Sequence, residues 1–283
     1  MKLQETAELP AASVSWAPPR PQTFQSGLIS YVAKTATIVG LEIRKLRHDS
    51  TELITRAIQP ALWLLVFGEV FTQVRAIPTG DLRYIDFMAP GVLAQSVLFI
   101  AIFYGISIIW ERDLGIVHKF LVSPTPRTAL VSGKALSAGV RGLSQAVIIY
   151  VLALLLSVRL NWDPLALLGV FVAVILGSAF FSTFSLIIAC IVKTRERFMG
   201  IGQVLTMPLF FASNAIYPIS IMPGWLRVVA HVNPLTYEVD ALRALMLAGG
   251  TSTFGLPVDF AVLVSVTVLF VFVGAALYPN VVR

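Results

Sequence analysis

Charged residues are scarce in this chain of 283 residues: they make up 13% of it, while hydrophobic residues make up 57%. Soluble globular proteins carry about 25% charged residues. Such a deficit excludes an ordinary water-soluble domain and indicates that much of the chain lies in hydrocarbon. The mean hydropathy of +0.83 agrees with that environment.

Cysteine and histidine are also rare, with one cysteine, Cys190, and three scattered histidines. One cysteine excludes an intramolecular disulfide, and no spacing of His, Cys or carboxylates fits a metal site. Enzyme motifs are missing too: Ser-Gly-Lys at 132–134 resembles the end of a phosphate-binding loop, but such a loop needs glycine where Thr128 stands. We therefore expect no enzyme activity, no cofactor and no metal in this chain.

Long apolar runs dominate what is present. Runs of about 18 residues or more with few charges are typical of membrane-spanning helices, and this sequence has six of them. The sequence therefore predicts an all-α polytopic membrane protein with a single transmembrane domain over residues 55–283. The expected spans cover about residues 57–74, 87–110, 135–158, 165–192, 198–218 and 258–278.

Two segments precede the first span. Residues 1–26 have no apolar core, which excludes a secretory signal, and their Pro, Ala and Ser content predicts a disordered cytoplasmic tail. Residues 27–54 repeat apolar residues at steps of three and four, with lysines and arginines off that stripe. This pattern predicts an amphipathic helix in the cytoplasmic membrane interface. A solvated helix packed on a partner protein is the alternative.

Lysines and arginines are sorted between the two sides of the predicted membrane. With the N-terminus inside, sixteen of the 21 fall on the cytoplasmic side or at cytoplasmic span ends. This bias follows the positive-inside rule, so the net charge of +6 reflects topology rather than nucleic-acid binding. We expect a multi-pass protein of the cell membrane with both termini in the cytoplasm. The five outer cations are Arg75, Arg83, Arg159, Arg227 and Arg243.

The segment 219–250 fits neither a span nor a free loop. It carries too many charges to cross a bilayer and too many large apolar residues to lie in water. Asn233-Pro234 in its middle favours a break between helices. We expect two short re-entrant helices on the outer side, just before the last span.

A charged segment, ERDLGIVHKFLVSPTPR at 111–127, lies between the second and third predicted spans. It is too charged to enter the bilayer and too short to form a domain, and Pro124 and Pro126 end its helix. Arg112, Lys119 and Arg127 place it on the cytoplasmic side. We interpret it as the segment that a soluble partner binds in order to move the neighbouring spans.

Two blocks of sequence resemble the membrane (permease) subunit of type-2 ATP-binding cassette (ABC) exporters, in the daunorubicin- and multidrug-resistance branch. The block at 111–136 is similar to the family's Glu-Arg-x-x-Gly and Leu-x-x-x-Pro cytoplasmic motif, except that proline follows Leu121 after three residues, not four. The block YPISIMPGWLRVVAHVNPLTYEVDALR at 217–243 resembles the family's signature region. The resemblance covers about residues 41–283.

The resemblance implies a fold, partners and site residues. The segment 111–127 would be a coupling helix that docks on a separate ATPase subunit, which binds ATP and Mg, and two permeases would pair as a homo- or heterodimer. The coupling residues would be Glu111, Arg112, Gly115, Lys119, Phe120, Leu121 and Pro124. The signature region would comprise Pro223, Trp225, Asn233, Pro234, Tyr237, Asp240 and Arg243.

Glu69 is the most informative residue for a substrate path. A charge near a helix centre costs about 2.5–3.5 kcal/mol on insertion scales, and the resemblance does not supply this glutamate. It would pair with a cation such as Arg75, stay protonated, or contact a cationic substrate. Phe210, Phe211 and Asn214 are the other candidates to line the path.

The resemblance implies ATP-driven export of an amphipathic drug-like or lipid molecule from the cytoplasm or inner leaflet. An exporter of polysaccharide, teichoic acid or lipo-oligosaccharide shares this fold and is the first alternative. A membrane scaffold or an ATP-independent channel is the second. A channel would need a polar pore helix, and a scaffold would not need the segment 111–127.

Overall fold

A computed structural model describes residues 58–74, 77–80, 82–117, 126–192 and 194–281, together with 31–33, 35–37, 39–40, 44 and 55. The expected tail at 1–26 and most of the expected interfacial helix at 27–54 lie outside the described residues. Within the described part the chain is helical, and its only β-pairing is an isolated bridge between Leu160 and Leu247. The prediction of an all-α chain is confirmed for these residues.

Four described helices are long and apolar enough to cross a membrane. The first consists of α4 (Tyr84–Tyr104) and α5 (Ile106–Asp113), and each of the four overlaps an expected span. The others are α7 (Arg127–Leu155), α8 (Pro164–Ile191) and α12 (Leu256–Leu277), the last extended by the short helix η3 (Tyr278–Val281).

Two shorter helices overlap the remaining expected spans. The helix Ile58–Val74 includes a π-helical stretch, η1 (Trp63–Gly68), followed by α3 (Glu69–Val74). The other is α9 (Arg195–Phe211), with 17 residues. Spanning helices contain about 17–25 residues, so α9 is at the lower limit.

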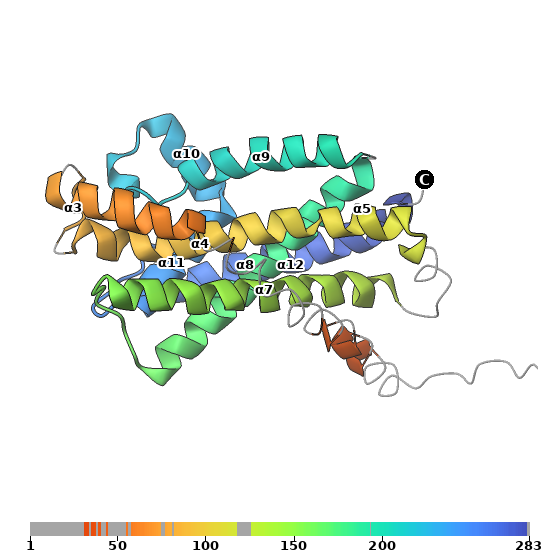
Figure 1. The fold of residues 1–283 in the computed structure, drawn as a ribbon, viewed down its shortest axis with the longest axis horizontal. Helices are drawn as coiled ribbons and strands as arrows, with labels where there is room; N and C mark the ends of the chain where they lie inside the picture. The colour runs from red at the N-terminus through yellow and green to blue at the C-terminus, as the bar shows by residue number, and fades with distance from the viewer. Residues whose placement is uncertain are drawn as a thin grey trace, which may run out of the picture.

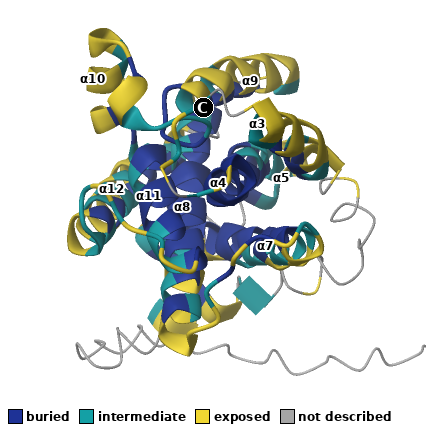
Figure 2. Ribbon diagram, turned by 90° about the vertical axis from the view of Figure 1, so that its left-hand side faces the viewer, coloured by how far each residue is buried: buried dark blue, intermediate teal, exposed yellow. Residues whose placement is uncertain are grey.

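α8 is the central helix of the bundle, as Figure 2 shows. It packs against α4, α7 and α12 and against the short helix α11 (Pro234–Met246). In the most apolar part of α4, 78% of residues are buried, compared with 22% in α12. α4 is therefore an inner helix, whereas α12 turns a broad apolar surface outward, as expected of a helix that faces lipid.

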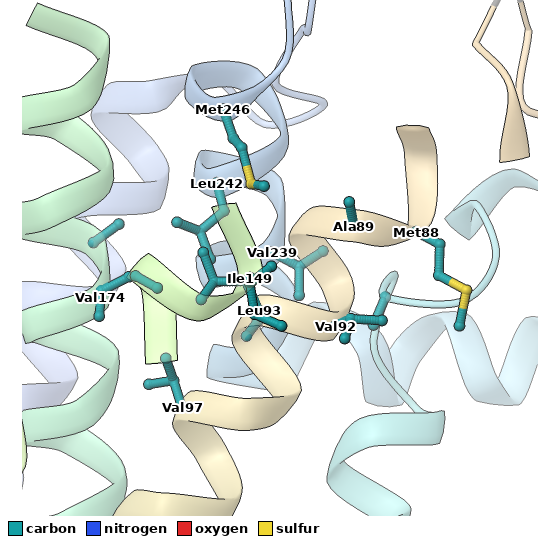
Figure 3. Close-up of a cluster of buried hydrophobic side chains, with 14 of the residues drawn as sticks. Met88, Ala89, Val92, Leu93, Val97, Ile149, Val174, Val239, Leu242 and Met246 are labelled. Atoms are coloured by element: carbon teal, nitrogen blue, oxygen red, sulfur yellow. The ribbon is translucent and has the colours of Figure 1, made fainter. Parts of the chain in front are cut away.

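The largest core cluster joins α11 to α4, α7 and α8. Figure 3 shows side chains from the four helices converging. α11 is therefore packed inside the bundle although it contains three charged residues. The labelled members are Met88, Ala89, Val92, Leu93 and Val97 of α4, Ile149 of α7, Val174 of α8, and Val239, Leu242 and Met246 of α11.

The bundle has two distinct ends. α5 and the C-terminus lie at one end in Figure 1, and α3 and the short helix α10 (Gly224–Val232) lie near the other. A second core cluster packs at the α5 end; it includes Ile109, Val117 and Tyr278. The residues that lead into the predicted coupling segment are therefore well packed.

Gly105 separates α4 from α5 at a point where three helices meet. The Ser185 hydroxyl of α8 donates a hydrogen bond to the carbonyl of Ile102, one turn before Gly105. A Cβ atom on Gly105 would overlap the Ser185 Oγ and lie 2.9 Å from Cζ of Phe198 in α9. The absence of a side chain at Gly105 is therefore what permits α8 and α9 to approach the joint.

We predict that Gly105→Ala lowers the free energy of unfolding by about 1–3 kcal/mol, because the added methyl group overpacks this joint. Gly200→Ala is the matched control, since no atom lies within 4 Å of a Cβ at that position of α9. The control should be neutral or stabilising by up to about 1 kcal/mol. Thermal unfolding of both variants in detergent checks this, and equal effects would contradict it.

Candidate functional site

An ion pair fastens the end of α5 to α7. Both carboxylate oxygens of Glu111 accept hydrogen bonds from the Lys134 ammonium, at 2.7 and 2.8 Å. The two side chains are only 13% and 8% exposed. Because the pair is largely shielded from water, removing one partner would leave the other as an uncompensated buried charge, which is costly.

A second ion pair fastens α5 to α9. The Arg195 guanidinium lies 2.7 Å from the Asp113 carboxylate and 3.9 Å from the ring centroid of Trp110. Arg112 also pairs with Asp113, at 3.1 Å. The end of α5 is thus joined to both α7 and α9.

Gly115 ends this part of the chain with a turn. Its φ of +70° is in the left-handed region, which glycine adopts without strain, and its N–H donates to the Arg112 carbonyl at 2.9 Å. Four of the predicted coupling residues lie beyond this turn and outside the described residues: Lys119, Phe120, Leu121 and Pro124. Their contact with a partner stays a prediction.

Asp240 of α11 organises the connection to α12. Its carboxylate accepts hydrogen bonds from the backbone N–H of Thr253 at 2.6 Å and of Phe254 at 3.0 Å. The hydroxyls of Ser252 and Thr253 donate to it as well, at 3.0 and 2.9 Å. Asp240 is fully buried, so this set of donors replaces water around its charge.

Arg243, one turn along α11, joins three parts of the chain. Its guanidinium donates to the Asn214 carbonyl at 2.7 Å and lies 3.8 Å from the centroid of the Phe87 ring in α4. The Asn214 side-chain amide in turn donates to Asp240, at 3.4 Å. Asp240, Arg243 and Asn214 therefore form one buried polar network, which we call the α11 network.

The other signature residues shape the break between α10 and α11. The Asn233 side chain accepts from the Leu235 N–H at 3.1 Å and donates to the Leu209 carbonyl at 2.7 Å. Pro234 then starts α11, a favourable position for a residue without a backbone donor. The Tyr237 hydroxyl donates to the His231 carbonyl at 2.7 Å.

Pro223 and Trp225 lie at the beginning of α10. Pro223 is its N-cap, in extended conformation, and Trp225 is 70% exposed. α10 also exposes Val228, Val229 and Val232. α10 therefore exposes an apolar face, although Arg227 and His231 are exposed on it as well.

The four residues expected to line a substrate path lie in different environments. Phe210 is fully buried, with its ring 5.9 Å from that of Trp63 in η1, whereas Phe211 is 43% exposed. Asn214 is 1% exposed, inside the α11 network. Glu69 is exposed, and its charge acts on Arg83.

Asp86 is a buried charge that the sequence analysis missed. Its carboxylate pairs with Arg83 at 2.7 Å and lies 3.8 Å from Nε of Arg159. The pKa of Arg83 is raised, mainly by its hydrogen bond to Asp86 and less by the charges of Asp86 and Glu69, while burial opposes the rise. Arg83 and Asp86 are three positions apart, and this spacing of opposite charges could have predicted the ion pair from the sequence.

Glu238 of α11 is a second buried acid that the sequence analysis passed over. Both of its carboxyl oxygens are buried without a hydrogen-bond partner in the protein, and they lie against Gly177 of α8. Burial raises the pKa of this carboxyl well above its ordinary value of 4.5. Burial therefore favours the protonated form of Glu238.

Comparisons with known proteins cover most of the chain. Residues 34–247 match the family model described as "ABC-2 type transporter". The chain is 28% identical over 203 residues to the "Putative transport permease ycf38" of Cyanophora paradoxa, covering 71% of this chain and 70% of that protein. It is 27% identical over 223 residues to the "Daunorubicin resistance ABC transporter permease protein DrrB1" of Streptomyces coeruleorubidus, covering 79% and 77%.

A mycobacterial relative extends the same similarity. The chain is 22% identical over 240 residues to the "Probable doxorubicin resistance ABC transporter permease protein DrrC" of Mycobacterium tuberculosis (strain CDC 1551 / Oshkosh). That alignment covers 83% of this chain and 85% of the relative. The matched residues include α4, α5, α7–α11 and both sequence blocks noted above.

We predict that Asp240→Ala lowers the free energy of unfolding by about 2–4 kcal/mol, because the Thr253 and Phe254 N–H groups lose their buried acceptor. Asp163→Ala is the matched control, since Asp163 is an exposed N-cap that accepts one hydrogen bond, from Ala166 at 3.3 Å. The control should cost about 1 kcal/mol. Chemical unfolding in detergent compares the two, and equal losses would count against the α11 network.

We predict a pH effect from Glu238. Above pH 4.5 the unfolded chain releases a proton that the folded chain retains, so the raised pKa makes stability fall as pH rises. Glu238→Gln should flatten the fall in melting temperature as pH rises above 4.5. Glu196→Gln, at an exposed position of α9, should keep the wild-type slope. A wild-type slope in Glu238→Gln would show that its carboxyl is not the source.

Proposed function

The chain belongs to the ABC-2 type transporter family, and on that premise we propose that it is the permease half of an ATP-driven exporter of amphipathic molecules. The resemblance seen in the two sequence blocks is thereby confirmed. Permeases of this family are the transport subunits of ABC transporters, whose ATPase is a separate subunit. We propose that ATP and Mg bind there and that two permeases pair in the complex.

The observation that carries the proposal is the way in which the end of α5 is tied into the bundle. Glu111 binds Lys134 of α7, and Asp113 binds Arg195 of α9. A force on the segment 111–127 therefore reaches three helices at once. A partner that moves this segment would move the bundle, which is what coupling to ATP binding requires.

A six-span topology is part of the proposal. The helix Ile58–Val74 and α9 supply the fifth and sixth crossings beside the four longer helices. The sorting of cations supports the orientation: Lys134 and Arg195 pair with the end of α5, whereas Arg83, Arg159 and Arg243 contact Asp86 or Phe87 at the start of α4. By the positive-inside rule the α5 end is cytoplasmic, and both termini are as well.

α10 and α11 are proposed as the re-entrant pair on the outer side. α10 exposes Trp225 and three valines, which suit the outer leaflet of the bilayer. α11 turns Asp240 and Arg243 into the bundle, where they are hydrogen-bonded. The charges that prevent this segment from spanning are therefore compatible with membrane depth.

The proposed mechanism is alternating access. ATP-driven closure of two ATPase subunits draws the coupling segments together, and the ion pairs of α5 pass this displacement to α7 and α9. The substrate is released outward because its affinity differs between the two states, since only differential affinity shifts an equilibrium.

The relatives named for daunorubicin and doxorubicin resistance support an amphipathic, drug-like cargo. Glu69 is proposed to contact a cationic group of such a cargo, and Phe210, Phe211 and Asn214 to contribute to its path. Export of polysaccharide, teichoic acid or lipo-oligosaccharide is the alternative within the same fold. A scaffold or a channel accounts less well for the ion-paired end of α5.

We predict that Leu121→Asp, combined with Phe120→Asp, reduces co-purification of the ATPase subunit by at least about tenfold. Apolar anchors at the centre of an interface carry much of its binding energy, and a buried carboxylate there would be unpaired. The measurement is recovery of a co-expressed ABC ATPase subunit by affinity capture of the tagged permease, with dye export measured in parallel.

The control for this experiment is Trp225→Ala, because Trp225 is a large exposed apolar residue of α10, toward the other end of the bundle. It should leave ATPase capture unchanged. Melting temperatures of all variants exclude unfolding as the cause of any loss. Wild-type capture by the double aspartate variant would overturn the assignment of 111–127 as the coupling segment.

A further inference from the structure

Three glutamines line one partly open cavity between helices of the bundle. The cavity has a volume of about 430 Å³, and its lining comes from the helical region near Gln59, from α4 and from α7. Pockets that bind small molecules are typically about 300–1,000 Å³ in size. The residues that define its chemistry are Gln59, Gln95, Gln145, Ser96, Phe99 and Phe103.

Two of these glutamines are buried without satisfying their polar groups. Gln95 of α4 is 2% exposed and Gln145 of α7 is 0% exposed. Neither the amide nitrogen nor the amide oxygen of either side chain has a hydrogen-bond partner among the residues that the structure describes. An unpaired buried amide costs about 1–3 kcal/mol, so two of them on one cavity lower the stability of the fold substantially.

The cavity also offers an apolar, flat surface. The rings of Phe99 and Phe103 are stacked one turn apart on α4, with centroids 6.2 Å apart and planes inclined by 24°. No described lining residue is charged. A ligand with a formal charge would therefore lose its hydration without gaining a counter-ion, which favours an uncharged ligand.

We propose that this cavity is a binding site, within one protomer, for an uncharged, flat amphipathic molecule that carries both carbonyl and hydroxyl groups. Each glutamine amide supplies a donor and an acceptor, so carbonyl groups of the ligand accept from the NH₂ groups and hydroxyl groups donate to the oxygens. The last torsion of glutamine is broad, so each amide turns toward the ligand at little cost. The rings of Phe99 and Phe103 contact the flat face of the ligand.

The site differs from the path proposed around Glu69, Phe210, Phe211 and Asn214, none of which lines this cavity. The inference rests on the proposed function only where it identifies the ligand as a transported molecule or part of one. Binding itself depends on the cavity alone and is measurable without the ATPase subunit.

The test measures equilibrium binding of 1,4-dihydroxyanthraquinone to the purified full-length permease in lipid nanodiscs. This probe is flat and uncharged near neutral pH, and it carries two carbonyl and two hydroxyl groups. Anthracene, which has the same ring frame without oxygens, is the matched ligand control. Saturable binding of the first and only unsaturable partitioning of the second is the expected result.

Gln95→Leu and Gln145→Leu should each weaken binding of the hydroxylated probe by about tenfold, since each removes one amide from the site. Both should fold, because leucine removes an unpaired buried polar group at similar volume. Gln203→Leu, at an exposed position of α9, is the control and should bind as wild type. Gln59→Trp narrows the cavity from an exposed position and should also weaken binding.

Three outcomes overturn the proposal. No saturable binding would mean that the cavity holds only water, and equal saturable binding of anthracene would mean that it accepts any apolar molecule, including a lipid chain. Unchanged affinity in the glutamine variants and in Gln59→Trp would place the probe elsewhere. If the wild-type protein binds the probe but the complete transporter exports none, this would count against the proposed function and not against this site.

Discussion

Within a bilayer, a buried polar group has no water to bind, so it needs a partner inside the protein, and this constraint governs how the bundle is built. α11 shows it most clearly. It carries three charged residue types within six positions, yet α4, α8 and α12 surround it. Asp240 is tolerated because backbone and hydroxyl groups of 252–254 replace its hydration, and Arg243 because it donates to the Asn214 carbonyl and stacks on Phe87. The same contacts hold α11, α4 and the turn before α10 together.

The two ends of the bundle meet this constraint in different ways. Toward the α10 end, Asp86 and Asp240 are fully buried and are satisfied by several partners each. At the α5 end, the pairs Glu111–Lys134 and Asp113–Arg195 are more exposed and join separate helices. The buried acids toward the α10 end hold neighbouring segments in place. The ion pairs at the α5 end connect helices at the surface where a soluble partner would bind. Gln95 of α4 and Gln145 of α7, like Glu238 of α11, are among the buried polar groups that the described part of the protein leaves without a partner.

Sequence patterns were sufficient for the helices and insufficient for the contacts between them. Long apolar runs predict helices whatever their neighbours are, and four of the six runs became membrane-length helices. Helix ends were less accurate, because local contacts decide them. α7 begins at Arg127, directly after the extended Pro126, and its first turns include Lys134, whose charge is paired with Glu111. Asn214 was expected to line a path, but its partners Asp240 and Arg243 lie 26 and 29 positions away. Gln95 and Gln145 gave no periodic signal, since single amides inside apolar runs look like ordinary packing.

The joint at Gly105 sets a mechanical limit on the coupling segment. α5 has eight residues, so it extends about 12 Å beyond the joint. A swing of about 10° would therefore displace its far end by about 2 Å, the scale of helix shifts that accompany switching in other proteins. Ser185 and Phe198 both pack against Gly105 and fill the space that a side chain would occupy at the joint. If a partner displaces this segment, the close packing at Gly105 leaves little freedom there to absorb the movement.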